Sequence, residues 1–114
     1  MLFKTDVINE ILVITPPEID LDASNSEEFK RNVTPLLDGY AIVVLDLQNI
    51  GFMDSAGLGA ILSLYKKVRA DNGEFRVYGM SKEVRALFDL VRMQRLFEIC
   101  DNREIALRIL SLNK

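Results

Sequence analysis

The sequence predicts an α/β (α+β) fold, with a mixed sheet of about four to five strands packed by about four helices. Two observations predict this class. Short apolar runs rich in β-branched residues alternate with segments whose apolar residues recur at helical spacing. The first two apolar runs lie close together, as in a hairpin, before that alternation begins. A chain of 114 residues with 49% apolar content suits one domain, and we expect it to span residues 1–114.

The amino-terminal elements are two strands. Residues 2–6 and 11–15 are short apolar runs with Asn9 and Glu10 between them, which predicts a hairpin or two neighbouring strands. Pro16-Pro17 ends the second run, because proline cannot donate a hydrogen bond to a sheet.

A first helix is expected next. Ser24 and Glu27 have the spacing of a capping box, and Pro35 should kink or shorten the helix near its end. Asp38-Gly39 ends it, since glycine favours the left-handed conformation that follows many helices. The inward-facing residues of this helix are Phe29, Val33, Leu36 and Leu37.

The middle of the chain predicts a buried strand over residues 41–47 and then a long helix. That helix ends near residues 71–73, where Asp-Asn-Gly stands, and its predicted inner face is Leu58, Ile61, Leu62, Tyr65 and Val68.

The remaining elements are a strand over residues 74–78, a helix capped by Ser81, a strand over residues 96–100 and a last helix that starts near Asp101. The two helices have inner faces of Val84, Leu87, Phe88 and Val91, and of Ile105, Ala106 and Ile109. No internal repeat or linker is visible.

The junction between the buried strand and the long helix holds the candidate site. Asp54 and Ser55 stand at the helix entrance. The Ser55 hydroxyl could cap free backbone N–H groups, or the same N–H groups and the helix dipole could receive a phosphate on it. For Asp54, capping and polar contact are favoured over metal binding or acid-base chemistry, because no second carboxylate stands nearby.

Two glycines in the first turns of this helix, Gly57 and Gly59, need an explanation, since each weakens a helix by roughly 0.5–1 kcal/mol relative to alanine. They could allow tight packing on the sheet, or leave a bare surface on which another protein approaches Ser55. The two point in different directions, so both explanations can hold.

Composition argues against several functions. A net charge of −3 lacks the basic face of nucleic-acid-binding domains. The chain has no histidine and a single cysteine, Cys100, which disfavours hydrolase and zinc chemistry; we expect Cys100 to pack as a small hydrophobe. No apolar run approaches a bilayer span and no signal peptide is evident, so we expect a cytoplasmic protein that binds no membrane, metal or cofactor.

The segment around Ser55 resembles the signature of bacterial anti-sigma factor antagonists, small proteins of the STAS domain family. The resemblance rests on Asp46-Leu47 at the strand end, Ile50, Phe52-Met53, and the string Asp54-Ser55-Ala56-Gly57-Leu58-Gly59. It extends upstream to Leu21-Asp22-Ala23-Ser24-Asn25, and downstream to Leu87-Phe88-Asp89-Leu90 and Leu96-Phe97-Glu98-Ile99, so it covers nearly the whole chain.

This resemblance implies a STAS-like domain and a regulatory, non-enzymatic role. Ser55 would be phosphorylated by an anti-sigma factor that is also a serine kinase. The unmodified protein would bind that kinase and free the sigma factor, the phosphorylated protein would release it, and a metal-dependent serine phosphatase would reset the cycle. The expected partner-binding residues are Asp22, Asn25, Met53, Asp54, Ser55, Ala56, Gly57 and Leu58. Asp22 and Asn25 could instead be turn formers, which is the more common role of Asp and Asn.

The chain departs from the family at two places. Members often have a glycine just before the Leu-Asp pair, where this chain reads Pro16-Pro17-Glu18-Ile19-Asp20, and Arg92 stands where a glycine often follows the third helix.

Two alternative functions are considered. One alternative is a STAS subunit of a transporter or another signalling assembly in which Ser55 is structural. The other, a small phosphate-handling enzyme, is disfavoured by the absence of histidine and of a glycine-rich phosphate loop.

Overall fold

The computed structural model describes residues 1–108, which form a five-stranded mixed sheet with helices on both faces. This confirms the predicted class. The strands are β1 (Lys4–Ile8), β2 (Ile11–Thr15), β3 (Ile19–Leu21), β4 (Ile42–Asp46), β5 (Ile50–Met53), β6 (Glu74–Tyr78) and β7 (Glu98–Cys100). The α-helices are α1 (Ser26–Val33), α2 (Ser55–Ala70), α3 (Lys82–Leu90) and α4 (Arg103–Ala106), with 3₁₀ turns η1 (Thr34–Leu37) and η2 (Met93–Arg95).

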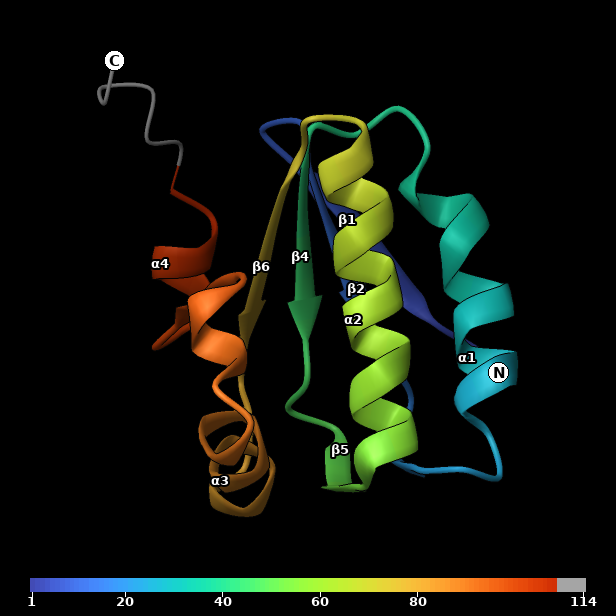
Figure 1. The fold of residues 1–114 in the computed structure, drawn as a ribbon. Helices are drawn as coiled ribbons and strands as arrows, with labels where there is room; N and C mark the ends of the chain where they lie inside the picture. The colour runs from blue at the N-terminus through green and yellow to red at the C-terminus, as the bar shows by residue number, and fades with distance from the viewer. Residues whose placement is uncertain (109–114) are drawn as a thin grey trace.

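The main sheet has the strand order β1-β2-β4-β6-β7 (Figure 1). β1 and β2 form the predicted antiparallel hairpin, closed by Asn9 and Glu10, which both have positive φ as the tightest hairpin turns require. The other pairs are parallel. A helix lies in each parallel connection of the main sheet. The helix α2 follows β4 after the short strand β5, so it begins at the edge of the sheet at which β4 ends.

A second sheet was not predicted. β3 and β5 pair in parallel, with Ile19 opposite Ile50 and Leu21 opposite Met53. The sequence predicted no strand between residues 47 and 54, because β3 and β5 are each too short to show a periodicity of their own. This small sheet places the segment before α1 next to the start of α2.

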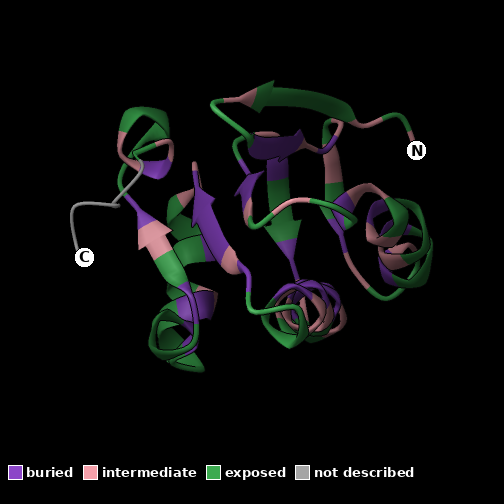
Figure 2. Cartoon of the chain, turned by 90° about the horizontal axis from the view of Figure 1, so that it is seen from above, coloured by how far each residue is buried: buried purple, intermediate pink, exposed green. Residues whose placement is uncertain are grey.

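The two faces of the main sheet carry separate apolar clusters. Figure 2 shows buried segments along the strands and on the helices beside them. The larger cluster lies under α1, α2 and α3 and contains the fully buried rings of Phe29 and Phe88. The smaller cluster lies on the opposite face, where Ala106 of α4 packs beside Val44 and Tyr78. Cys100 belongs to it, as predicted, and burial raises the pKa of its thiol to about 11.

Inner faces were predicted with some errors. In α2, Leu64 and Ala60 are buried while Leu62 and Tyr65 are half-buried, so the helix turns slightly away from the predicted face. Val91, predicted to face inward, is 48% exposed because α3 has already ended. Ile109 lies outside the described residues.

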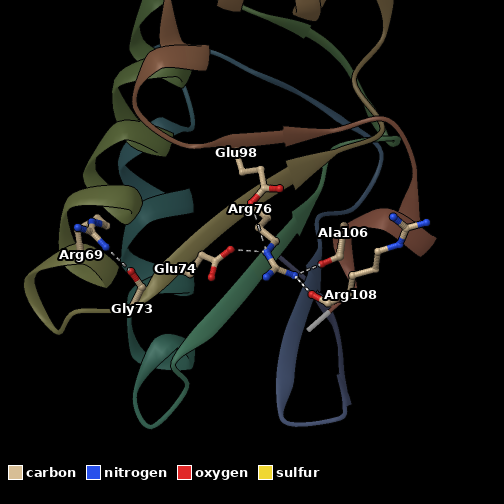
Figure 3. A network of polar contacts seen from close by, with 7 residues as sticks. All are labelled: Arg69, Gly73, Glu74, Arg76, Glu98, Ala106 and Arg108. Carbon is tan, nitrogen blue, oxygen red and sulfur yellow. Dashed lines mark hydrogen bonds and ion pairs between the residues drawn. The ribbon is translucent and has the colours of Figure 1, made fainter. Parts of the chain in front are cut away.

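The buried charge of Arg76 is a feature that strand periodicity did not reveal. Its side chain is 1% exposed on the α4 face of the sheet (Figure 3). The Nη1 atom donates to the carbonyl oxygens of Ala106 at 2.7 Å and Arg108 at 2.6 Å, and Nε lies 2.8 Å from a carboxylate oxygen of Glu74. A buried guanidinium needs such partners to offset its loss of hydration. Arg76 therefore ties the segment around α4 to β6.

A second buried polar group closes the carboxyl end of β4. Asp46 is 1% exposed and accepts hydrogen bonds from the Tyr78 hydroxyl at 2.7 Å and the Gln48 side chain at 2.8 Å. Burial, together with the hydrogen bond to Asp46, raises the pKa of the Tyr78 phenol. The Asp46 carboxylate is thus a structural group that fixes the end of β4.

No helix in the described part of the chain is long and apolar enough to cross a bilayer.

We predict that Arg92→Gly stabilises the protein. Arg92 follows α3 with φ 61° and ψ 37°, a left-handed conformation that side chains other than glycine adopt at a cost. Glycine relieves this cost, but it also gives the unfolded chain more conformational entropy, which favours unfolding. The net effect should be a rise of about 0.5–1 kcal/mol in the free energy of unfolding. Urea denaturation would measure the change. Arg92→Ala removes the same charge but keeps Cβ, so an equal gain in that control would contradict the conformational explanation.

Candidate functional site

The candidate site is the turn from β5 into α2. Asp54 has the extended backbone of an N-cap residue (φ −109°, ψ −172°), and its Oδ1 accepts a hydrogen bond from the Gly57 N–H at 3.0 Å. One orphan donor of the helix is thereby satisfied. The sequence left open whether Ser55 or Asp54 would make this bond. Asp54 is the cap.

Ser55 is the first residue of α2 and is exposed. Its hydroxyl makes no hydrogen bond to any described residue. The backbone N–H groups of Ser55 and Ala56 also lack partners within residues 1–108, as expected in a first helical turn. An exposed hydroxyl beside free N–H donors and the positive end of the helix dipole is a favourable acceptor for a phosphoryl group.

The turn between β3 and α1 lies against this helix entrance. The Asp54 N–H donates to the Leu21 carbonyl at 3.3 Å, and the Ala23 N–H donates to Asp54 Oδ2 at 3.1 Å. The structure therefore brings together the two segments that the resemblance motif combines, although Ala23 and Asp54 are 31 positions apart.

Within this turn, Asp22 and Asn25 act as turn formers. Asp22 accepts from the Ser24 N–H at 2.9 Å and the Ser24 hydroxyl at 2.6 Å, and these bonds lower the pKa of its carboxyl. Asn25 bonds the backbone of Asp22 and of Asp20. The predicted capping box is wrong: α1 begins after Asn25 without a side-chain cap, because the Asp22 carboxylate holds the Ser24 hydroxyl.

The two glycines of α2 face different surroundings. A Cβ atom on Gly57 would lie 2.3 Å from the Leu21 carbonyl oxygen, closer than any side chain tolerates, so Gly57 permits the close approach of α2 to the β3–α1 turn. A Cβ on Gly59 would meet nothing within 4 Å. Packing thus explains Gly57, and only Gly59 leaves a bare surface beside Ser55, one helical turn away.

A family model describes most of the chain. The STAS domain model matches residues 3–106, from β1 through α4. The chain belongs to the STAS domain family.

Curated relatives of this STAS domain are named for one activity. An anti-sigma F factor antagonist of Paenibacillus polymyxa is 40% identical over 65 residues, which cover 57% of this chain and 56% of that protein. The match thus spans little more than half of the relative. An anti-sigma-B factor antagonist of Staphylococcus aureus is 26% identical over 87 residues, which cover 75% of this chain and 81% of that protein. These names denote regulators, in agreement with the predicted non-enzymatic role.

Solved structures share the fold. A Thermotoga maritima protein, described as a candidate anti-sigma factor antagonist, superposes with a TM-score of 0.85 at 23% identity and covers 98% of this chain and 95% of its own. The Bacillus cell fate determinant SpoIIAA in its phosphorylated form has a TM-score of 0.67 at 19% identity, with 99% of this chain and 100% of that chain covered.

The predicted site residues of the STAS domain divide into a surface and its support. Ser55 is exposed, and Asp22, Asn25, Asp54 and Ala56 are half-buried. Met53, Gly57 and Leu58 are buried and lie beneath that surface. Phe52, which was not among the predicted site residues, is 52% exposed two residues before the helix cap and adds an apolar side chain near this surface. Within the described residues, no group of three His, Cys, Asp or Glu side chains is arranged to hold a metal.

Proposed function

We propose that this STAS domain is an anti-sigma factor antagonist that binds an anti-sigma serine kinase when Ser55 is unmodified and releases it when Ser55 is phosphorylated. One observation carries the proposal. Among the described residues, Ser55 is the only exposed serine whose hydroxyl is free of hydrogen bonds, and it stands at the amino terminus of the longest helix. The activity named for the curated relatives supports the choice of partner.

Electrostatics supports a switch that acts on binding rather than on folding. A phosphate adds about −1.5 to −2 charges beside Asp54. In the free protein, the end of α2 offsets part of the repulsion, by typically about 0.3–1 kcal/mol. Burial of the same dianion in an interface would cost several kcal/mol unless a cation met it. The interface cost is larger, so the modified protein keeps its fold and loses its partner.

The remaining steps of the cycle belong to other proteins. The kinase would bind ATP and transfer its terminal phosphoryl group to Ser55, and a metal-dependent serine phosphatase would remove the phosphate. The STAS domain itself then needs neither catalytic residues nor a cofactor. The alternative role, as a constitutive subunit of a transporter or signalling assembly, differs in one measurable respect: its partner would stay bound whether or not Ser55 is modified.

We predict that the cognate kinase phosphorylates Ser55 and no other described serine. The hydroxyl of Ser24 donates to Asp22, and that of Ser63 donates to the Gly59 carbonyl at 3.1 Å. The Ser81 hydroxyl oxygen caps α3 by accepting a hydrogen bond from the Val84 N–H at 3.2 Å. Ser26 is buried. Mass spectrometry after incubation with the kinase and ATP would locate the label. Stoichiometric modification of Ser24, Ser63 or Ser81 with Ser55 unmodified would overturn the assignment.

A further inference from the structure

Asp54 joins two segments that are distant in the sequence. One carboxylate oxygen accepts from the Gly57 N–H at 3.0 Å, inside α2, and the other accepts from the Ala23 N–H at 3.1 Å, in the turn before α1. The Asp54 N–H adds a bond to the Leu21 carbonyl at 3.3 Å. A helix cap needs only the first of these three bonds. The other two fix the turn to the helix entrance.

The tip of this turn, which consists of Ala23 and Ser24, has few other attachments. Both residues are exposed. The side-chain hydrogen bonds of Asp22 and Asn25 stay within the turn or reach back to Asp20. Among the hydrogen bonds of the described residues, only the one from the Ala23 N–H to Asp54 links the tip to α2. Without it, the tip would retain its internal shape and lose its fixed position relative to Ser55.

We propose that Asp54 is a positioning residue that holds the Ala23–Ser24 tip beside Ser55, so that the kinase recognises the two segments as one surface. This inference rests on the proposed function and adds a tertiary requirement to it. The partner must read a folded, two-segment surface rather than the residues around Ser55 alone. The chemistry explains the choice of aspartate: its short side chain ends in two acceptor oxygens, and each of them faces one of the two N–H donors.

Asp54→Ser is the decisive variant. Serine caps helices well, so the bond to the Gly57 N–H can be kept, but its side chain is too short to reach Ala23 as well. We expect amide hydrogen exchange at Ala23 to become about tenfold faster while Gly57 stays protected. In phosphorylation of Ser55 by the kinase, KM should rise about tenfold with kcat little changed, because recognition is impaired and the hydroxyl is not.

Asn102→Ala is the matched control, since it removes an equivalent cap from α4, where Asn102 Oδ1 accepts the Ile105 N–H at 2.9 Å. It should change neither Ala23 exchange nor KM. Asp54→Asn provides a second test: it keeps the length of the side chain but presents only one acceptor oxygen, and it should reproduce the Asp54→Ser result.

The two readouts separate the possible failures. An unchanged KM in Asp54→Ser would overturn the positioning role. A raised KM with unchanged exchange at Ala23 would also overturn it, because that result would indicate direct contact of Asp54 with the kinase. A wild-type protein that the kinase neither binds nor phosphorylates would overturn the proposed function, and the recognition role with it, even if exchange showed that Asp54 holds the tip.

Discussion

Ser55→Asp is expected to weaken binding of the anti-sigma kinase at least about tenfold, which corresponds to about 1.4 kcal/mol, without changing the fold. The carboxylate would lie at the exposed start of α2, where the helix dipole and the free N–H groups of Ser55 and Ala56 tolerate negative charge. In the interface, the same charge must be desolvated beside Asp54. A carboxylate carries less charge than a phosphate, so phosphorylated Ser55 should weaken binding further.

Calorimetric titration would measure affinity, and circular dichroism with thermal melting would report the fold. Ser55→Ala is the matched control. Because Asp54 is the helix cap, the loss of the Ser55 hydroxyl should cost much less than the roughly 1 kcal/mol typical of a lost cap, and the variant should bind and never release. If both Ser55→Asp and phosphorylated wild type bound undiminished, the switch would be refuted and the constitutive-subunit function favoured.

Gly57→Ala is expected to destabilise the protein by about 1–3 kcal/mol, the usual range for overpacking. The new Cβ would lie 2.3 Å from the Leu21 carbonyl oxygen and 2.9 Å from the Met53 side chain. The backbone contact cannot be relieved by a rotamer change, so α2 or the β3–α1 turn must move. The melting temperature should fall by roughly 4 °C or more for each kcal/mol in a protein of this size.

Gly59→Ala is the control for this experiment and also tests the bare surface. Nothing lies within 4 Å of the added methyl group, so improved helix propensity should raise the free energy of unfolding by about 0.5–1 kcal/mol. If a partner approaches Ser55 closely along this face, the same variant should bind more weakly despite its higher stability. Destabilisation by Gly59→Ala equal to that by Gly57→Ala would contradict the distinction between the two glycines.

The predictions that succeeded rest on local signals. The β1–β2 hairpin, the strand over residues 74–78 and the Ser81 cap of α3 each depend on residues within a few positions of one another. Pro35 marks the change from α1 to a 3₁₀ turn, and Gly39 has the positive φ expected after a helix. Hydrophobic periodicity and special backbone geometry depend on residues that are neighbours in the sequence, so they can be recognised without knowledge of the tertiary structure.

The failures concern polar groups with several possible partners. Ser24 has the spacing of a capping box, yet its hydroxyl donates to the carboxylate of Asp22, and α1 begins one residue later, after Asn25. Arg76 occupies a strand position at which a charge would ordinarily face solvent. Its burial depends on carbonyl groups around α4, about 30 positions later, which no local pattern reveals.

The sequence alone determined the fold class and the junction at which α2 begins, because hydrophobic periodicity specifies them, and one short string made Ser55 the candidate phosphorylation site. Only the tertiary structure decided which groups act at that junction. The pairing of β3 with β5 brings Leu21 against Gly57, and the Ala23 N–H against Asp54, so Asp54 takes the cap and the Ser55 hydroxyl stays free. Either side chain could have capped the helix, and the contact from a distant segment favours the one with two acceptor oxygens.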